Sequence, residues 1–440
     1  MTNLESAGLI LAGMLALIAL RVPIGAAMFV AGAAGYVALV GQSALLAYLK
    51  GLLWARFSVY DLSVIPLFLL MGQFASAAGF SRTLFQAANT FMGHRPGGVA
   101  MASIVACMAF GSICGSSVAT AATMSQVALP EMKRLNYSDR LATASLAVGG
   151  TLGILIPPSV ILIIYALLAE QSIVKLFAAA LVPGIVAASL YLVTVRIYVH
   201  FAPGQAGLQP RAGAEERLAA VRAAWPIAAI FLVIFVGIYG GYFTATEGAA
   251  VGTVATLGLG LGRRQLDWPA VAHCFLPTAQ ATAMILTVLL GANMMNTALA
   301  VSQVPADMAA WIAGLEVPPL LIVAGFLASF ILLGCVLDEL AMMLLLLPIL
   351  LPSILALELF GLSLEQKAIW FGILMLIAIG IGLVAPPIGL NVYVVANIAR
   401  TVQTGEIYRG VLPFLAADFV RLTLILLLPQ ITLWALRFVR

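Results

Sequence analysis

Glycines, hydroxyl groups and acids interrupt the apolar stretches of this sequence at two places where ions could bind. The first place is the run 111–117, Gly-Ser-Ile-Cys-Gly-Ser-Ser, inside the apolar stretch 98–130. Ser116 and Ser117 offer hydroxyl oxygens beside Gly115, and hard cations prefer oxygen ligands. The alternative is that these small side chains only allow helices to pack closely.

The second place is the tip Gly334–Glu339, in the middle of the apolar stretch 319–352. It brings two neighbouring acids, Asp338 and Glu339, into a run that otherwise lacks charge. Because a charged side chain at membrane depth is costly, such a residue is a functional candidate by default. We expect Asp338 to take part in binding. The role of Glu339 stays open, because a tip that reaches water would simply solvate one carboxylate.

A proline pair follows each of these two places. Gly153-Ile-Leu-Ile-Pro-Pro158 recurs as Gly382-Leu-Val-Ala-Pro-Pro387, each time midway along a long apolar run. Leu181-Val-Pro183 is further matched by Val411-Leu-Pro413 with one residue of extra spacing. Proline lacks an N–H and disfavours helix in the residue before it, so each helix must break there. Two matches in register predict an internal repeat.

A broken membrane helix can bind ions at both of its new ends. Its freed carbonyls and C-terminal half-helix ends coordinate Na⁺, while N-terminal half-helix ends attract carboxylates. Thr151 and Ser159 flank the first break and could add hydroxyl oxygens, and Asn391 follows the second break. For Asn391, a hydrogen bond between helices is the alternative.

The composition places most of the chain in lipid. Of its 440 residues, 63% are hydrophobic and only 9% are charged, with mean hydropathy +1.13. A soluble domain carries about 25% charged residues, and a membrane-spanning helix needs about 20 apolar residues. The chain supplies many such stretches without strand-like alternation. We therefore predict an all-α polytopic membrane protein, in contact with the bilayer and with no nucleic-acid partner.

The motifs of common enzyme classes are absent from the sequence. It has no Gly-x-x-x-x-Gly-Lys-Ser/Thr nucleotide loop, and its three histidines do not form His-Glu-x-x-His. Its four cysteines form no Cys-x-x-Cys pair and suit small core residues. We expect neither an enzyme nor a transition-metal site.

The two interrupted runs are too long for one ordinary span each, which predicts re-entrant hairpins that enter and leave the membrane on one side. If the first opens to the cytoplasm and the second to the outside, thirteen Lys and Arg fall inside and six outside, as the positive-inside rule requires. Both termini then lie outside. The two proline breaks lie on oppositely directed helices, so the repeat is inverted, a common plan for secondary transporters.

Residues between these elements complete the map. The segment 43–60 suits a helix at the membrane interface, and the polar stretch 201–224 suits a central cytoplasmic loop. The expected division is N-terminal scaffold helices with an interfacial arm in 1–97, a first transport half in 98–175, scaffold helices and the central loop in 176–318, a second transport half in 319–410 and a C-terminal helix in 411–440.

Over nearly its whole length the chain resembles the large membrane subunit of tripartite ATP-independent periplasmic (TRAP) transporters, the DctM family. The motifs that carry this resemblance are Pro66–Gly72, Gly115–Ala122, Gly153–Pro158, Thr246–Gly252 and Gly334–Asp338 with Pro348 and Pro352. Gly248 stands where the family often has alanine, a small departure.

The resemblance implies a sodium-coupled importer of an organic acid that works by an elevator movement in the bacterial inner membrane, with no cofactor other than Na⁺ as coupling ion. It also implies two partners, a small Q-type membrane subunit and a periplasmic P-type substrate-binding protein. Because this chain begins directly at the large-subunit pattern, we expect the small subunit to be a separate chain. The alternative is an ion-coupled organic-anion transporter that needs no binding protein.

The resemblance also implies the binding residues. Sodium site one would be formed by Gly115, Ser116, Ser117, Thr151, Gly153 and Pro157. Sodium site two would be formed by Gly334, Asp338, Gly380, Gly382 and Pro386. A carboxylate substrate would bind between the tips, at Ser116, Ser159, Asp338 and Asn391.

Overall fold

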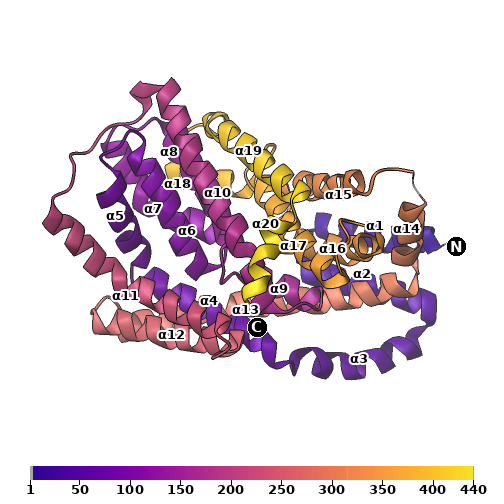
Figure 1. The fold of residues 1–440 in the computed structure, drawn as a ribbon. Helices are drawn as coiled ribbons and strands as arrows, with labels where there is room; N and C mark the ends of the chain where they lie inside the picture. Colours follow the sequence, from indigo (N-terminus) through magenta and orange to yellow (C-terminus); the bar gives the residue numbers. More distant parts are fainter. Residues whose placement is uncertain (1–2, 315, 440) are drawn as a thin grey trace.

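Residues 3–314 and 316–439 are described by the computed structural model, which in these ranges contains helices and no strands (Figure 1). Seven of the helices there are long and apolar enough to cross a membrane, or eight if one bent pair counts as a single span. Helices are expected because a backbone in hydrocarbon must satisfy its own hydrogen bonds. The prediction of an all-α chain with many membrane spans is confirmed.

The N-terminal part consists of α1 (Asn3–Ala19), α2 (Ile24–Val40), α3 (Gln42–Phe57), the short 3-10 helix η1 (Tyr60–Ser63), α4 (Val64–Ala77) and α5 (Phe80–Met92). The helix predicted over 43–60 corresponds to α3. No apolar run predicted α5, because its apolar residues follow only one face of the helix and polar residues interrupt the run.

A first unit follows, made of α6 (Gly98–Cys114), α7 (Ser117–Arg134), α8 (Asp139–Leu155), α9 (Val160–Leu168) and α10 (Ile173–Phe201). A tight turn joins α6 to α7. The helix axis bends by 42° between α8 and α9, where the first proline pair lies. The predicted first break is therefore present.

The middle of the chain consists of the 3-10 helix η2 (Pro203–Gln205), α11 (Ala214–Tyr239), α12 (Ala245–Gly262), α13 (Trp268–Val301) and α14 (Val304–Ala313). The prediction of a loop over 201–224 is wrong for its second half, since 214–224 is the start of α11. Residues 214–224 include five Ala, two Glu, two Arg and one Leu, all of which favour helix. The N–H of Gly213 also donates to Glu216 Oε2 at 3.1 Å and closes the helix start.

The second unit repeats the order of the first with α15 (Pro319–Gly334), α16 (Glu339–Ala356), α17 (Leu364–Gly382), α18 (Leu390–Ala399) and α19 (Thr404–Leu427). It ends in α20 (Gln430–Leu433) and the 3-10 helix η3 (Trp434–Phe438). The break between α17 and α18 contains the second proline pair, as predicted. Along the chain, each unit thus contains two helices joined by a tight turn, then a broken helix, then a long helix. The long helix has an internal proline, Pro183 in the first unit and Pro413 in the second.

The two broken helices lie against each other in opposite directions. Tyr165, in α9, donates its hydroxyl hydrogen to the carbonyl of Ala368 at 2.6 Å, near the start of α17. Ala147, in the middle of α8, accepts a hydrogen bond from Asn391 at the start of α18. Positions that rise along the first unit therefore meet positions that fall along the second. This antiparallel contact agrees with the inverted relation that the sequence repeat predicts.

Close glycine contacts hold α2 against α13. A Cβ atom at Gly25 would lie 2.8 Å from the backbone of Val288, and one at Gly32 would lie 2.8 Å from that of Met295. Because real Cβ atoms do not approach so closely, glycine at both places allows the two backbones to meet. This pair lies outside the two repeated units.

Candidate functional site

The first tip is the turn between α6 and α7. Gly115 has φ +66°, a left-handed conformation that suits glycine. Ser116 caps α7, and its side chain faces the N–H of Ala119 at 3.5 Å. The hydroxyl of Thr120 donates to the carbonyl of Ser116 at 2.7 Å. The turn at the first tip is thus formed by the left-handed Gly115 and stabilised by hydroxyl groups of its own residues.

The first tip packs on the first break. A Cβ atom at Gly115 would lie 3.1 Å from the backbone nitrogen of Val160, the first residue of α9. Ser159 caps α9 and is fully buried. Its hydroxyl donates to the carbonyl of Ile154 at 2.7 Å and faces the N–H of Leu162 at 3.4 Å.

The second tip joins α15 to α16, and Asp338 caps α16. Its Oδ1 accepts hydrogen bonds from the N–H groups of Leu340 and Ala341, both at 2.9 Å. The N–H of Gly389, just before α18, donates to the carbonyl of Cys335 at 3.1 Å. The second tip therefore contacts the second break, as the first tip contacts the first.

Each unit also has one crossing of glycines. A Cβ atom at Gly111 would lie 2.6 Å from Cα of Gly153, and one at Gly334 would lie 3.0 Å from Cα of Gly382. These contacts bring the C-terminal end of a hairpin helix against the C-terminal part of a broken helix. Such ends carry free carbonyls and partial negative charge, so each crossing is suited to a cation.

The two tips meet through Glu339. This residue is 7% exposed, and its carboxylate interacts with the backbone N–H of Ser117 and the side chain of Ser116. Asn391 adds a second link between the units, because its Nδ2 donates to Ser117 Oγ at 2.7 Å and to the carbonyl of Ala147 at 3.0 Å. Ser117 is thus contacted by residues more than 200 positions away.

Four helix N-termini converge on this region, those of α7, α9, α16 and α18. The tip and break contacts described above bring them together in pairs. Each N-terminus carries about half a positive charge, which favours anions. At three of them a capping side chain, Ser116, Ser159 or Asp338, already faces an N–H group. The region therefore combines ends that attract a carboxylate with carbonyl ends that attract a cation.

The structure separates the predicted site residues into groups. Ser116, Ser117 and Gly153 of the first predicted set lie together with Asn391. Thr151 does not join this group. Its side chain faces α10, where its hydroxyl lies 3.2 Å from that of Tyr191. Thr151 is also close to Gly380 of the second set, since a Cβ atom there would lie 3.6 Å from Cβ of Thr151.

The remaining predicted residues lie in turns and breaks. Asp338 and Ser159 act as helix caps, which is compatible with a further binding role and does not require one. Pro157 and Pro386 lie in the two breaks, each followed by a cis peptide bond to the next proline. Gly334 and Gly382 form the glycine crossing of the second unit.

Comparison with known proteins fits this architecture. Residues 11–431 match the family model described as "Tripartite ATP-independent periplasmic transporter, DctM component". The chain belongs to the DctM family. It is therefore a TRAP transporter large permease, a transporter and not an enzyme.

Relatives of this DctM-family chain carry different organic acids in their names. The C4-dicarboxylate TRAP transporter large permease protein DctM of Pseudomonas aeruginosa is 32% identical over 375 residues, covering 85% of this chain and 86% of the relative. The sialic acid TRAP transporter large permease protein SiaM of Vibrio cholerae is 28% identical over 377 residues, covering 85% and 86%. The isethionate TRAP transporter permease protein DctMQ of Oleidesulfovibrio alaskensis is 29% identical over 391 residues, covering 88% and 60%.

A solved structure shows the same fold at low identity. The crystal structure of the Alcanivorax borkumensis YdaH transporter superposes with a TM-score of 0.66 at 14% sequence identity, covering 89% of this chain and 90% of that one. This match supports the fold of the DctM-family chain.

Sequence reasoning missed one buried network. Asp418 and Arg421, in α19, form an ion pair of 2.8 Å with side chains 1% and 3% exposed. The hydroxyl of Tyr191, in α10, lies 2.7 Å from Asp418 Oδ2 and also contacts Thr151. A charged pair three residues apart in an apolar run was the available signal, but its partner in α10 could not be found from the sequence.

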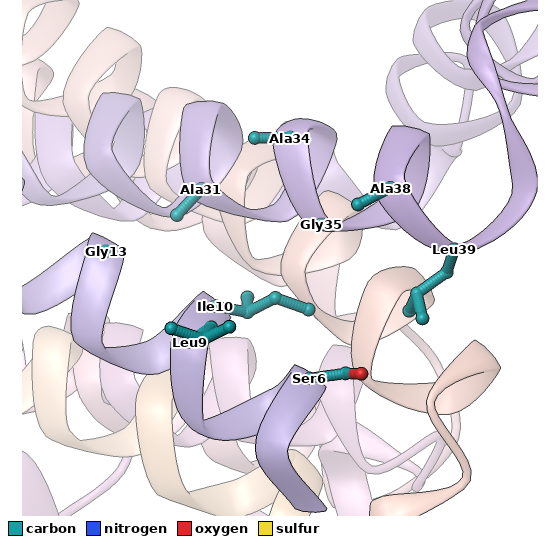
Figure 2. A pocket seen from close by; sticks show the side chains of 9 residues that line it. All are labelled: Ser6, Leu9, Ile10, Gly13, Ala31, Ala34, Gly35, Ala38 and Leu39. Atoms are coloured by element: carbon teal, nitrogen blue, oxygen red, sulfur yellow. The ribbon is translucent and has the colours of Figure 1, made fainter. Parts of the chain in front are cut away.

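Two surface hollows differ in chemistry from the tips. The groove in Figure 2, of about 530 Å³, lies between α1 and α2 and is lined by Ser6, Leu9, Ile10, Gly13, Ala31, Ala34, Gly35, Ala38 and Leu39. Its lining has no charged residue, so it does not suit an organic anion. A second hollow of about 450 Å³ has a polar lining that includes Glu170, Asn293 and Asn296, between the end of α9 and α13.

Proposed function

We propose that this DctM-family chain is the large permease subunit of a sodium-coupled importer of an organic acid. It would lie in the bacterial inner membrane with both termini in the periplasm. The observation that carries the proposal is the meeting of two hairpin tips and two broken helices in one region, where N-terminal and carbonyl ends lie together.

An organic acid fits because converging helix N-termini attract carboxylates. The relatives above are named for C4-dicarboxylates, sialic acid and isethionate. These compounds differ in size and share an acidic group. We therefore assign this chain the same class of substrate, bound between the tips.

Sodium fits the other half of the site. Carbonyl ends meet at the glycine crossings of both units, and hydroxyl oxygens of Ser116 and Ser117 lie at the first tip. Hard cations bind such oxygen ligands, and broken helices of secondary transporters provide them for Na⁺. We assign one sodium site to each unit, close to the sets predicted from the sequence.

The transport movement would carry the tips across the membrane as one body. We assign α6–α7 and α15–α16 as re-entrant hairpins, which move with the broken helices α8–α9 and α17–α18. The pair α2–α13, closely packed through its glycines, would belong to the fixed scaffold. Such an elevator exposes one binding site alternately to the two sides, which an inverted repeat allows.

Two partners complete the proposed transporter, a separate small membrane subunit and a periplasmic substrate-binding protein. The relative whose name joins M and Q is longer than this chain, which covers only 60% of it. The joined name supports a Q-type membrane component beside an M-type chain. The binding protein would deliver the acid from the periplasmic side.

Reconstitution tests the proposal. Proteoliposomes would contain this chain, a small TRAP subunit and a binding protein from the same organism, with labelled succinate, sialic acid or isethionate outside. We expect uptake of at least one acid, driven by an inward Na⁺ gradient and lost when K⁺ replaces Na⁺ or when either partner is omitted.

Three outcomes would change the assignment. Equal uptake in K⁺ would contradict sodium coupling. Uptake by this chain alone would favour a transporter that needs no binding protein. Uptake of none of the three acids under a sodium gradient would contradict the assigned substrate class.

A further inference from the structure

Glu339 is a buried acid without a cationic partner. It is 7% exposed, and none of the ion pairs among the described residues includes it. Its carboxylate interacts with Ser116 and the N–H of Ser117, yet Oε2 has no hydrogen-bonding partner within the described ranges. An unpaired charge or an unsatisfied acceptor in such a place is costly, so a missing partner is indicated.

A second acceptor without a donor lies near the same serine. Asn391 is fully buried, and its Oδ1 has no partner among the described residues. The orientation of this amide is fixed, because the carbonyl of Ala147 can only accept and must face Nδ2. Glu339 and Asn391 both contact Ser117, one at its N–H and one at its Oγ.

We propose that Glu339 is a ligand of a sodium ion held between the two tips, together with Asn391 Oδ1 and the Ser116 hydroxyl. One cation there satisfies both unpartnered oxygens and neutralises the buried charge. An oxygen-rich set with one carboxylate suits a hard cation. This inference rests on the proposed sodium coupling. It adds to the sodium site of the first unit two ligands, Glu339 and Asn391, that come from the second unit.

A sodium ion at this place would make binding of the organic-acid substrate depend on sodium. Glu339 comes from the second tip, whereas the serines come from the first, so the ion joins the two halves of the repeat. Without the ion, the negative charge of Glu339 would oppose the carboxylate of the substrate. With the ion bound, that repulsion is offset and the four helix N-termini can hold the anion.

Direct sodium binding to the purified full chain tests this inference without any substrate. Binding of ²²Na⁺ and the thermal unfolding midpoint would be measured in NaCl and in choline chloride, for wild type, Glu339→Gln and Glu339→Asp. We expect Glu339→Gln to weaken sodium binding about tenfold or more, the scale of one lost charge-assisted contact. Glu339→Asp keeps the charge and should retain part of the affinity.

The matched control is Glu215→Gln, which removes an exposed carboxylate at the start of α11. It should bind sodium as wild type does. A purely structural Glu339 would shift the unfolding midpoint equally in both salts and leave ²²Na⁺ binding unchanged, which would overturn the inference. If wild type itself neither binds ²²Na⁺ nor is stabilised by NaCl, the proposed sodium coupling fails as well.

Discussion

Asp418 and Glu339 are both buried acids of the second unit, but their surroundings differ. Asp418 pairs with Arg421 at 2.8 Å and contacts the hydroxyl of Tyr191. Glu339 has no ion pair in the described chain and keeps an unsatisfied oxygen at the meeting of the tips. A buried charge must be compensated. Asp418 is compensated by a side chain of the protein, whereas we propose that Glu339 is compensated by a bound cation.

Removing the partner of the compensated acid should have the largest effect on stability. Arg421→Met leaves Asp418 as an uncompensated buried charge, so we expect the free energy of unfolding to fall by about 3–5 kcal/mol. Thermal unfolding in detergent would measure it, with the same loss in NaCl and in choline chloride. The double variant Asp418→Asn with Arg421→Met should recover part of the loss. An unchanged midpoint for Arg421→Met would show that the pair contributes nothing.

The next effect should come from Tyr191, which contacts Asp418 from α10. Tyr191→Phe removes a hydrogen bond to a charged group and should cost about 2 kcal/mol of unfolding free energy. The same unfolding assay measures it, again without dependence on sodium. Sodium affinity that fell with Tyr191→Phe would instead tie this network to the ion site through Thr151.

In the absence of sodium, substitution of Glu339 should not lower the unfolding free energy, unlike the substitutions of Arg421 and Tyr191. Glu339→Gln removes an uncompensated buried charge, so in choline chloride the unfolding free energy should rise by about 1 kcal/mol or stay unchanged. In NaCl the variant should lose the stabilisation that wild type gains. A large loss of stability in choline chloride would show that the protein itself compensates Glu339.

The smallest effect is expected at an exposed pair that also joins the two units. Lys175 and Glu365 lie 2.5 Å apart, with side chains 40% and 48% exposed. Because exposed pairs contribute about 0–1 kcal/mol, Glu365→Gln should change the unfolding midpoint little and ²²Na⁺ binding not at all. If Glu365→Gln lowered the unfolding midpoint as much as Arg421→Met does, burial could not explain why Asp418 and Glu339 differ.

The sequence was sufficient for features that depend on local physics. Both breaks follow from the proline pairs, which cannot continue a helix, and the first tip follows from the glycine turn at Gly115. Membrane spans follow from composition. The start of α11 was missed because four charged residues interrupt 214–224, although the helix preference of this segment is strong. The short helix α14 was missed because it is too short to span a membrane.

Contacts between distant segments could not be predicted. Asp338 was predicted to take part in binding because it is an acid inside an apolar run, and in the structure it caps α16. Its neighbour Glu339 faces Ser117 more than 200 residues away, which depends on how two hairpins pack. Asn391 was singled out as a polar residue in an apolar helix, but its bond to Ser117 depends on the antiparallel contact of the two broken helices.

The most direct test is a pair of experimental structures of the full chain, one determined in NaCl and one in choline chloride. The account predicts density between Glu339 Oε2, Asn391 Oδ1 and the Ser116 hydroxyl in sodium, at about 2.4 Å from its oxygen ligands as for other hard cations. That density should be absent in choline chloride. No such density in either salt, or Glu339 turned toward a protein cation, would contradict a sodium ion shared by the two tips.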